Sequence, residues 1–134
     1  MKKILFFSLL LFSITVHAQN VVSLTFQPGD LGLGLRYDRE IKQSGFYVSA
    51  TKGNYALGES YVKDHLKGSA GVLFKNYSLG IAYHSYGERV GEFTKNAFKP
   101  VSLEAGVRVS VDWFVACIRV DSKGEGTIDF GIRF

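Results

Sequence analysis

Apolar and polar residues alternate along most of the sequence between Val22 and Phe134. The clearest run covers residues 101–111, where Val, Leu and Ala take every second position and Ser, Glu, Gly and Arg lie between them. A period of two residues is typical of a β-strand with one apolar and one polar face. The alternation predicts eight strands, at residues 21–27, 31–39, 46–55, 66–75, 77–86, 101–111, 113–121 and 126–134.

Each predicted strand has two faces, which we call face A and face B. Face A holds mainly Val, Leu, Ile, Phe, Tyr and Ala, whereas face B holds Gly, Ser, Thr and charged residues. Face A comprises the odd-numbered residues of strands 31–39, 77–86 and 101–111 and the even-numbered residues of the other five strands; face B comprises the rest. The sequence therefore predicts an all-β chain whose strands share one facial pattern.

Two short turns test this assignment, because the residues that flank a two-residue hairpin turn pair with each other and share a face. Phe74 and Tyr77 flank one such turn, and both belong to face A. Val111 and Phe114 flank another, and they too belong to face A. The turns and the alternation therefore predict the same hairpins.

Alternation alone does not decide which face meets water. Face A would be the core of a soluble sandwich, but it would face lipid in a transmembrane barrel whose lumen is filled by face B. Most predicted strands have nine to eleven residues, enough to cross a bilayer at a tilt of about 45°. Long connections at 55–65 and 87–100 fall at one end and short turns at the other, a pattern typical of outer-membrane proteins. We therefore predict an eight-stranded antiparallel up-and-down transmembrane β-barrel.

The N-terminus has the features of a secretory signal peptide. Lys2 and Lys3 precede an apolar run that ends at Val16, and a small-x-small pattern predicts cleavage between Ala18 and Gln19. The apolar run is shorter than the ~20 residues of a membrane-spanning helix. We therefore expect a signal peptide at residues 1–18, a single barrel domain at residues 19–134, and export to the bacterial cell outer membrane.

Aromatic residues of face A gather at the predicted periplasmic ends of the strands. Outer-membrane barrels carry such aromatic girdles where the membrane meets water. A soluble sandwich gives no reason to collect aromatic residues at one level. The predicted girdle consists of Tyr37, Phe46, Phe74, Tyr77, Phe114 and Phe134.

The last predicted strand, GTIDFGIRF, places Ile128, Phe130, Ile132 and Phe134 on face A. It resembles the C-terminal assembly signal of bacterial outer-membrane proteins, a strand that the barrel-insertion machinery recognises. Together with the signal peptide, the chain resembles the small eight-stranded barrels of the OmpA/OmpX class in pattern and length, not residue by residue. The resemblance implies an outer-membrane location, with lipid and the barrel-assembly machinery as partners.

The charged residues of face B predict a paired network inside the barrel. Side chains fill the interior of an eight-stranded barrel, and buried charges need partners. The hairpin register places Arg108 opposite Cys117, and it places Arg119 diagonal to Glu104, where Arg119 would neutralise the like-charged pair of Glu104 and Asp121. A conduction path is the alternative interpretation. The predicted network contains Arg36, Asp38, Glu104, Arg108, Arg119, Asp121, Asp129 and Arg133.

Two alternatives to a structural or surface-recognition role stay open. Some small outer-membrane barrels are lipid A acyl hydrolases with a Ser/His pair, and His84 and Ser85 suggest one here, although alternation points them to opposite faces. Glu59, Ser60 and His65 form a weaker set in a predicted loop. The other alternative is an exported, lipocalin-like ligand-binding barrel, which requires face A inside.

Composition narrows the remaining function classes. Removing a signal peptide that holds two of the 16 Lys and Arg residues, and no acid, leaves a net charge of +2, which does not favour nucleic acid as a partner. Cys117 is the single cysteine, and no Cys/His set has metal-ligand spacing. We therefore predict no cofactor, no metal site and no catalytic residue. The expected protein is a monomer whose loops 55–65 and 87–100 meet an unknown extracellular ligand.

Overall fold

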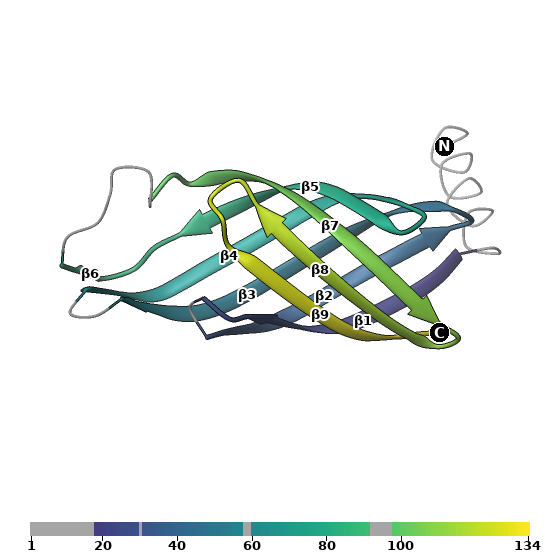
Figure 1. Cartoon of the computed structure of the whole chain (residues 1–134), viewed down its shortest axis with the longest axis horizontal. Coiled ribbons are helices and arrows are strands. Elements are labelled where there is room, and N and C mark those ends of the chain that lie inside the picture. The colour runs from purple at the N-terminus through teal and green to yellow at the C-terminus, as the bar shows by residue number, and fades with distance from the viewer. Residues whose placement is uncertain (1–17, 30, 58–59, 92–97) are drawn as a thin grey trace, which may run out of the picture.

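The structure, a computed structural model, describes residues 18–29, 31–57, 60–91 and 98–134 (Figure 1). These residues form eight long strands and one short strand. The strands are β1 (Ala18–Gln27), β2 (Gly32–Ile41), β3 (Ser44–Leu57), β4 (Ser60–Phe74), β5 (Tyr77–Ser85), β6 (Arg89–Val90), β7 (Val101–Val111), β8 (Phe114–Asp121) and β9 (Gly126–Arg133). No helix within the described part of the chain is long and apolar enough to cross a membrane.

The eight long strands close into an antiparallel up-and-down barrel. Each pairs with its neighbours along the chain, and β9 returns to pair with β1, so that Val22 lies opposite Ile132. The short strand β6 pairs with the first part of β4 beyond the region where β5 pairs. The predicted fold class of an all-β, eight-stranded antiparallel barrel is therefore confirmed.

Three hairpin turns and both described termini lie at one end of the barrel, which we call the turn end. The turns at residues 42–43, 75–76 and 112–113 each begin with a residue at positive φ, as turns that match the twist of the flanking strands do. Asn20 and Phe134 exchange two backbone hydrogen bonds of 2.9 Å at this end. We call the opposite end the loop end; it carries the connections β1–β2, β3–β4, β5–β7 and β8–β9 (Figure 1).

The two predicted hairpins have the expected register, with Phe74 opposite Tyr77 and Val111 opposite Phe114. Several strands are longer than the alternation predicts. The β2–β3 connection is a two-residue turn, because β2 continues to Ile41 and pairs it with Ser44. The predicted loop at 55–65 is wrong in extent, because β3 continues to Leu57, β4 begins at Ser60, and the two strands pair beyond a register shift after Gly53.

Face B lies inside the barrel and face A outside. Charged side chains such as Arg36, Arg119 and Asp129 are each 1% exposed, whereas Leu24 is 70% exposed. This distribution inverts that of a water-soluble domain, in which large apolar side chains are buried and charges are solvated. The interior of the barrel is therefore a polar core made by facing strands.

Candidate functional site

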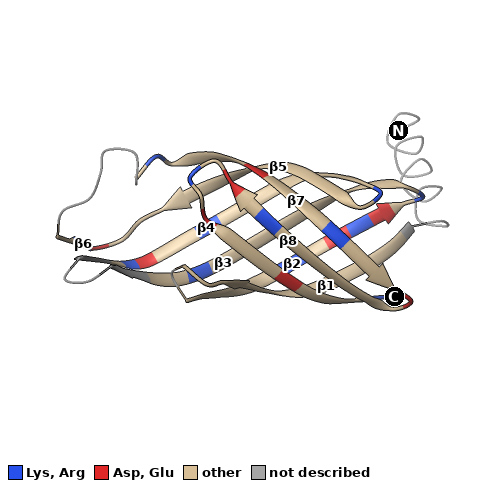
Figure 2. Ribbon diagram, viewed as in Figure 1, with Lys and Arg blue, Asp and Glu red and all other residues tan. Residues whose placement is uncertain are grey.

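The centre of the interior is held by two arginines and two carboxylates. Arg119 binds Asp129 through two hydrogen bonds of 2.8 Å, and its Nη1 donates to Glu104 Oε1 at 2.6 Å. Arg36 Nη1 donates to Asp129 Oδ2 at 2.9 Å and therefore shares this carboxylate with Arg119. Such paired, hydrogen-bonded charges tolerate burial where single charges do not. Figure 2 shows the charged residues on neighbouring strands along the barrel.

Tyr47 on β3 fills the space between these groups, and its side chain is completely buried. Its hydroxyl donates to Glu104 Oε1 at 2.8 Å, and Arg36 lies over the ring with Cζ 4.3 Å from its centroid. Glycines make this position possible, because a Cβ added at Gly71 would come within 2.6 Å of the ring. An aromatic ring and two glycines, Gly71 and Gly80, therefore fit together within the polar core.

Lys67 on β4 neutralises the like-charged pair formed by Glu104 and Asp121, which lie opposite each other on β7 and β8. Its Nζ lies 3.0 Å from Glu104 Oε2 and 3.2 Å from Asp121 Oδ2. The register predicts Arg119 as the neutralising cation, and Arg119 does reach Glu104. Lys67 is the cation that contacts both carboxylates.

A second cluster of charges lies inside the turn end. Arg108 and Arg133 both bind the carboxylate of Glu40 on β2; Arg133 Nε lies 3.1 Å from Glu40 Oε2. Arg108 Nε also lies 3.4 Å from Asp38 Oδ2. All eight residues of the predicted network therefore lie inside the barrel, Arg133 being partly exposed, and salt bridges link them into adjoining groups.

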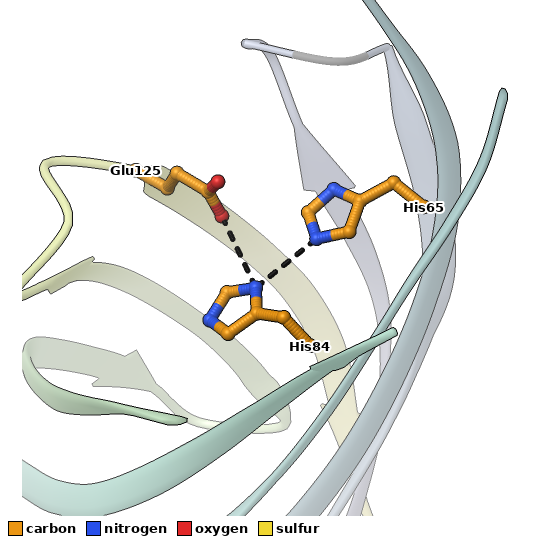
Figure 3. A group of neighbouring side chains, drawn as sticks. All are labelled: His65, His84 and Glu125. Carbon is orange, nitrogen blue, oxygen red and sulfur yellow. Dashed lines mark hydrogen bonds and ion pairs between the residues drawn. The ribbon is translucent and has the colours of Figure 1, made fainter. Parts of the chain in front are cut away.

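Near the loop end, the interior holds a cluster of two imidazoles and one carboxylate (Figure 3). His65 Nε2 on β4 lies 3.0 Å from His84 Nδ1 on β5, and Glu125 Oε2 lies 3.6 Å from the same His84 nitrogen. The other nitrogen of His84, Nε2, lies 2.8 Å from Ser102 Oγ and 3.5 Å from Asp121 Oδ2. The donor atoms of His65, His84 and Glu125 lie within 4.8 Å of one another, so these residues can hold a metal ion.

The surroundings of the cluster hold its members in place. The ring of Tyr86 stacks on His65 with centroids 4.6 Å apart, and Gln27 Nε2 donates to Glu125 Oε2 at 2.9 Å. Burial raises the pKa of Glu125 above its ordinary value, and burial lowers the pKa of the neighbouring Lys123. Both shifts follow from the removal of a charged group from water.

Several of these residues are absent from the predicted network, among them Glu40, His65, Lys67 and Glu125. Continuing the alternation by one residue would place Glu40 and His65 on face B, but both lie just outside the predicted strands, which end at residue 39 and begin at residue 66. Lys67 is on the predicted face B but is not included in the network. Glu125 lies in a connection, where alternation gives no signal. The sequence predicts no metal site, because no Cys/His set has metal-ligand spacing along the chain. In the structure, β4 begins at Ser60 and His65 is buried, so that its side chain lies beside His84 and Glu125.

His84 and Ser85, the residues of the hydrolase alternative, point to opposite faces, as the alternation indicates. His84 is 2% exposed and points inward, whereas Ser85, the next residue, is exposed on face A. The hydroxyl that His84 contacts is that of Ser102 on β7. In the weaker set, Glu59 lies outside the described residues, and the side chain of Ser60 is not described. Parts of the predicted loops at 55–65 and 87–100, and residues 1–17 of the predicted signal peptide, also lie outside the described residues.

The aromatic residues of the predicted girdle lie around the turn end on the outside of the barrel. Phe134 is 72% exposed, and Tyr37 is partly covered because its hydroxyl donates to Asn20 Oδ1 at 2.7 Å. Trp113, in the β7–β8 turn, joins them with 64% exposure. The side chains Ile128, Phe130, Ile132 and Phe134 of the last predicted strand all belong to face A; Ile128 is partly covered and the other three are exposed.

No protein-family model, curated protein or solved structure matches this chain. The closed eight-stranded antiparallel barrel is compatible with the small barrels that the sequence resembles. A fold of this kind supports unrelated functions. What the protein does is therefore inferred from its own residues and their geometry.

Proposed function

We propose that this protein is an integral outer-membrane β-barrel with a non-enzymatic, structural or surface-recognition role. The observation that carries the proposal is the inverted distribution of exposure between the two faces. Apolar side chains such as Leu24, Leu103 and Leu33 are 66–70% exposed on the outside, while charges fill the inside. Each large apolar side chain left in water costs about 1.5–3 kcal/mol relative to burial, and a continuous apolar belt is a surface for lipid.

The exported lipocalin-like alternative requires face A to line a central cavity. In the structure, face A lies outside, and most of the buried side chains in the described part of the chain are the polar and charged residues of face B. The apolar surface that would bind a ligand is therefore on the outer wall. This facing favours lipid as the partner of face A.

The filled interior supports a scaffold role over a conduction path. Arg36, Arg119 and Glu104 cross the centre and engage partners on several strands. Ions cannot pass without breaking these pairs, so we expect no stable conductance in planar bilayers. A rigid barrel of this kind presents its loop end, with the β3–β4 and β5–β7 connections, as its recognition surface. The last strand is the expected contact of the barrel-assembly machinery, and a monomer suffices for this role.

The contact of His84 Nε2 with Ser102 Oγ, at 2.8 Å, favours one second candidate, a lipid-modifying enzyme. A Ser hydroxyl against an imidazole nitrogen is the arrangement of a serine hydrolase. However, Ser102 is 2% exposed and faces the interior, whereas a lipid acyl chain approaches the outer wall. Lipid A mass spectra of cells with and without the gene separate the candidates: altered acyl chains support the enzyme, and an unchanged pattern supports the scaffold.

The membrane proposal is tested by fractionation together with two matched substitutions on face A of β7. Leu103 is 66% exposed and lies opposite Ile81, away from the turn, whereas Val111 is 64% exposed beside the turn. Arginine on the lipid face costs about 2–4 kcal/mol at the bilayer midplane and about 0–1 kcal/mol near the interface. We expect Leu103→Arg to reduce folding into vesicles much more than Val111→Arg. Recovery of the wild-type protein in the soluble fraction, or equal tolerance of both substitutions, would contradict the proposal.

A further inference from the structure

We propose that His65, His84 and Glu125 form a binding site for a divalent transition-metal ion, with Zn²⁺ as the ion of the test. The three residues come from β4, β5 and the β8–β9 connection, and their side chains converge near the loop end (Figure 3). The site depends on the fold of the barrel and not on its membrane location. It therefore goes beyond the proposed scaffold function and can be tested separately.

The spacing of the donor atoms fits a tetrahedral ion. Metal–ligand distances of about 2.0–2.1 Å in a tetrahedral zinc site place neighbouring donor atoms roughly 3.3–3.4 Å apart. His65 Nε2 and His84 Nδ1 are 3.0 Å apart, and His84 Nδ1 and Glu125 Oε2 are 3.6 Å apart. The third spacing falls within the 4.8 Å limit of the group. Glu125 is 22% exposed in a connection, so a small rotation of its side chain completes the geometry.

His84 has the contacts of a metal-binding histidine whose second ring nitrogen is held by another protein group. A metal-bound histidine donates its second ring N–H to a carboxylate, carbonyl or water, and this bond orients the ring. His84 Nε2 lies 2.8 Å from Ser102 Oγ, and Ser102 in turn donates to Asp121 Oδ2 at 3.3 Å. When Nε2 carries the proton, the lone pair of Nδ1 points toward His65 and Glu125. The tautomer that this network favours is thus the one that binds a metal.

The carboxylate is also held in place. Gln27 Nε2 on β1 donates to Glu125 Oε2 at 2.9 Å, while Lys123 Nζ lies 3.9 Å from Glu125 Oε1. Tyr86 stacks on His65 and lies beneath Lys123 Nζ, which is 4.5 Å from its ring centroid. The ring excludes water from one side of the site, and Lys123 is the cation that competes with a metal for Glu125.

The carboxylates in and around the cluster outnumber the lysines. Lys67 from β4 faces the site but is bound by Glu104 of β7 and Asp121 of β8, at 3.0 Å and 3.2 Å. Glu125 and Lys123 come from the β8–β9 connection. A divalent ion would therefore add to a region in which three carboxylates face two lysines. Two imidazoles with one carboxylate suit Zn²⁺, Ni²⁺, Cu²⁺ or Fe²⁺ better than Mg²⁺ or Ca²⁺, which prefer oxygen ligands.

The test measures zinc binding to the folded, chelator-treated barrel in detergent by isothermal titration calorimetry. We expect one Zn²⁺ per chain, no comparable binding of Mg²⁺, and a higher urea midpoint with zinc because the ion joins β4, β5 and the β8–β9 connection. Glu125→Gln and His65→Asn are expected to weaken binding by about ten-fold or more. Lys123→Gln is expected to strengthen it, because the competing cation is removed.

Glu88→Gln is the matched control, because Glu88 is a solvent-exposed acid near the same end, paired with Lys63 at 3.8 Å. It should bind zinc like the wild type. Heat-dependent gel migration shows that each variant is folded before titration. The proposal is overturned if the folded wild type shows no saturable zinc binding. It is also overturned if folded Glu125→Gln and His65→Asn bind as tightly as Glu88→Gln, since the zinc then lies elsewhere.

Discussion

Removing Arg119 is the most informative change in the polar interior. Arg119 is 1% exposed and holds Asp129 with two hydrogen bonds and Glu104 with one. Without it, Asp129 keeps Arg36 at 2.9 Å and Glu104 keeps Lys67 at 3.0 Å, so each carboxylate loses one of its two cations. Breaking a buried ion pair from one side costs about 3–5 kcal/mol. We expect Arg119→Ala to lower the free energy of unfolding by this amount.

Two further variants separate charge from volume and from surface effects. Arg119→Met keeps most of the side-chain volume, so we expect nearly the same loss as for Arg119→Ala. Lys52 pairs with Asp64 at 3.0 Å, but both side chains are about two-thirds exposed. Exposed pairs contribute about 0–1 kcal/mol, and Lys52→Ala should therefore change the free energy of unfolding by no more than this.

The assay is an equilibrium urea titration of the barrel in phospholipid vesicles, followed by heat-dependent gel migration and by the fluorescence of Trp113. A loss of 3–5 kcal/mol lowers the folding equilibrium constant by roughly two to four powers of ten. If Arg119→Ala and Arg119→Met both remain within about 1 kcal/mol of the wild type, the interior salt bridges do not hold the barrel together. The reasoning from buried charge would then be refuted.

Three other substitutions test separate parts of the structure. Gly80→Ala drives a methyl group against the Tyr47 hydroxyl and the backbone carbonyl of Ala70, and it should cost about 1–3 kcal/mol. Gly68→Ala, with no atom within 4 Å of the added Cβ, should be nearly neutral in the same titration. Equal effects of the two substitutions would argue against tight packing around Gly80. Glu40→Gln removes the carboxylate that Arg108 and Arg133 share, and it should lower the free energy of unfolding by about 1–3 kcal/mol. The loss is smaller than for Arg119→Ala because the turn end is partly exposed. An unchanged free energy of unfolding would contradict this pairing. Burial raises the pKa of Glu125 above 4.5, so ionisation of Glu125 opposes folding. The metal-free wild type should therefore lose stability relative to Glu125→Gln as the pH rises from about 4.5 toward neutrality. If the two proteins differ in urea midpoint by the same amount at pH 4 and at pH 7, this prediction is contradicted.

The alternation of residues was enough to predict the architecture. A period of two residues specifies which side chains share a face. A one-residue slip in the pairing of two strands would turn every side chain of one strand to the opposite face. The register of β7 and β8 therefore follows from the turn between Val111 and Phe114. Which face lies inside does not follow from the period, because lipid and a protein core favour the same apolar residues. The structure supplies that answer by burying Arg36 and exposing Leu24.

The alternation of residues could not predict the cluster of His65, His84 and Glu125, for a physical reason. The alternation is weak at strand ends, because polar residues there are compatible with both a strand and a loop. In addition, Asp64, next to His65, has a φ of 54° and interrupts the regular strand. His65 and His84 lie on the adjacent strands β4 and β5, but Glu125 lies far from both in the sequence and meets them only in the closed barrel. The β4–β5 register places Lys67 opposite His84, but the contact of His84 with Glu125 depends on the β8–β9 connection.

Fluorescence quenching by brominated lipids tests the central claim, that face A lies in the hydrocarbon of a membrane. The sequence has one tryptophan, Trp113 at the turn end, and Ile81 is a 57% exposed face-A residue within β5. Bromines placed at different acyl depths should quench Trp113 most strongly when they lie near the interface. In the Trp113→Phe, Ile81→Trp protein they should quench most strongly when they lie deep in the chains. Fluorescence that brominated lipids leave unchanged at both positions would contradict the claim.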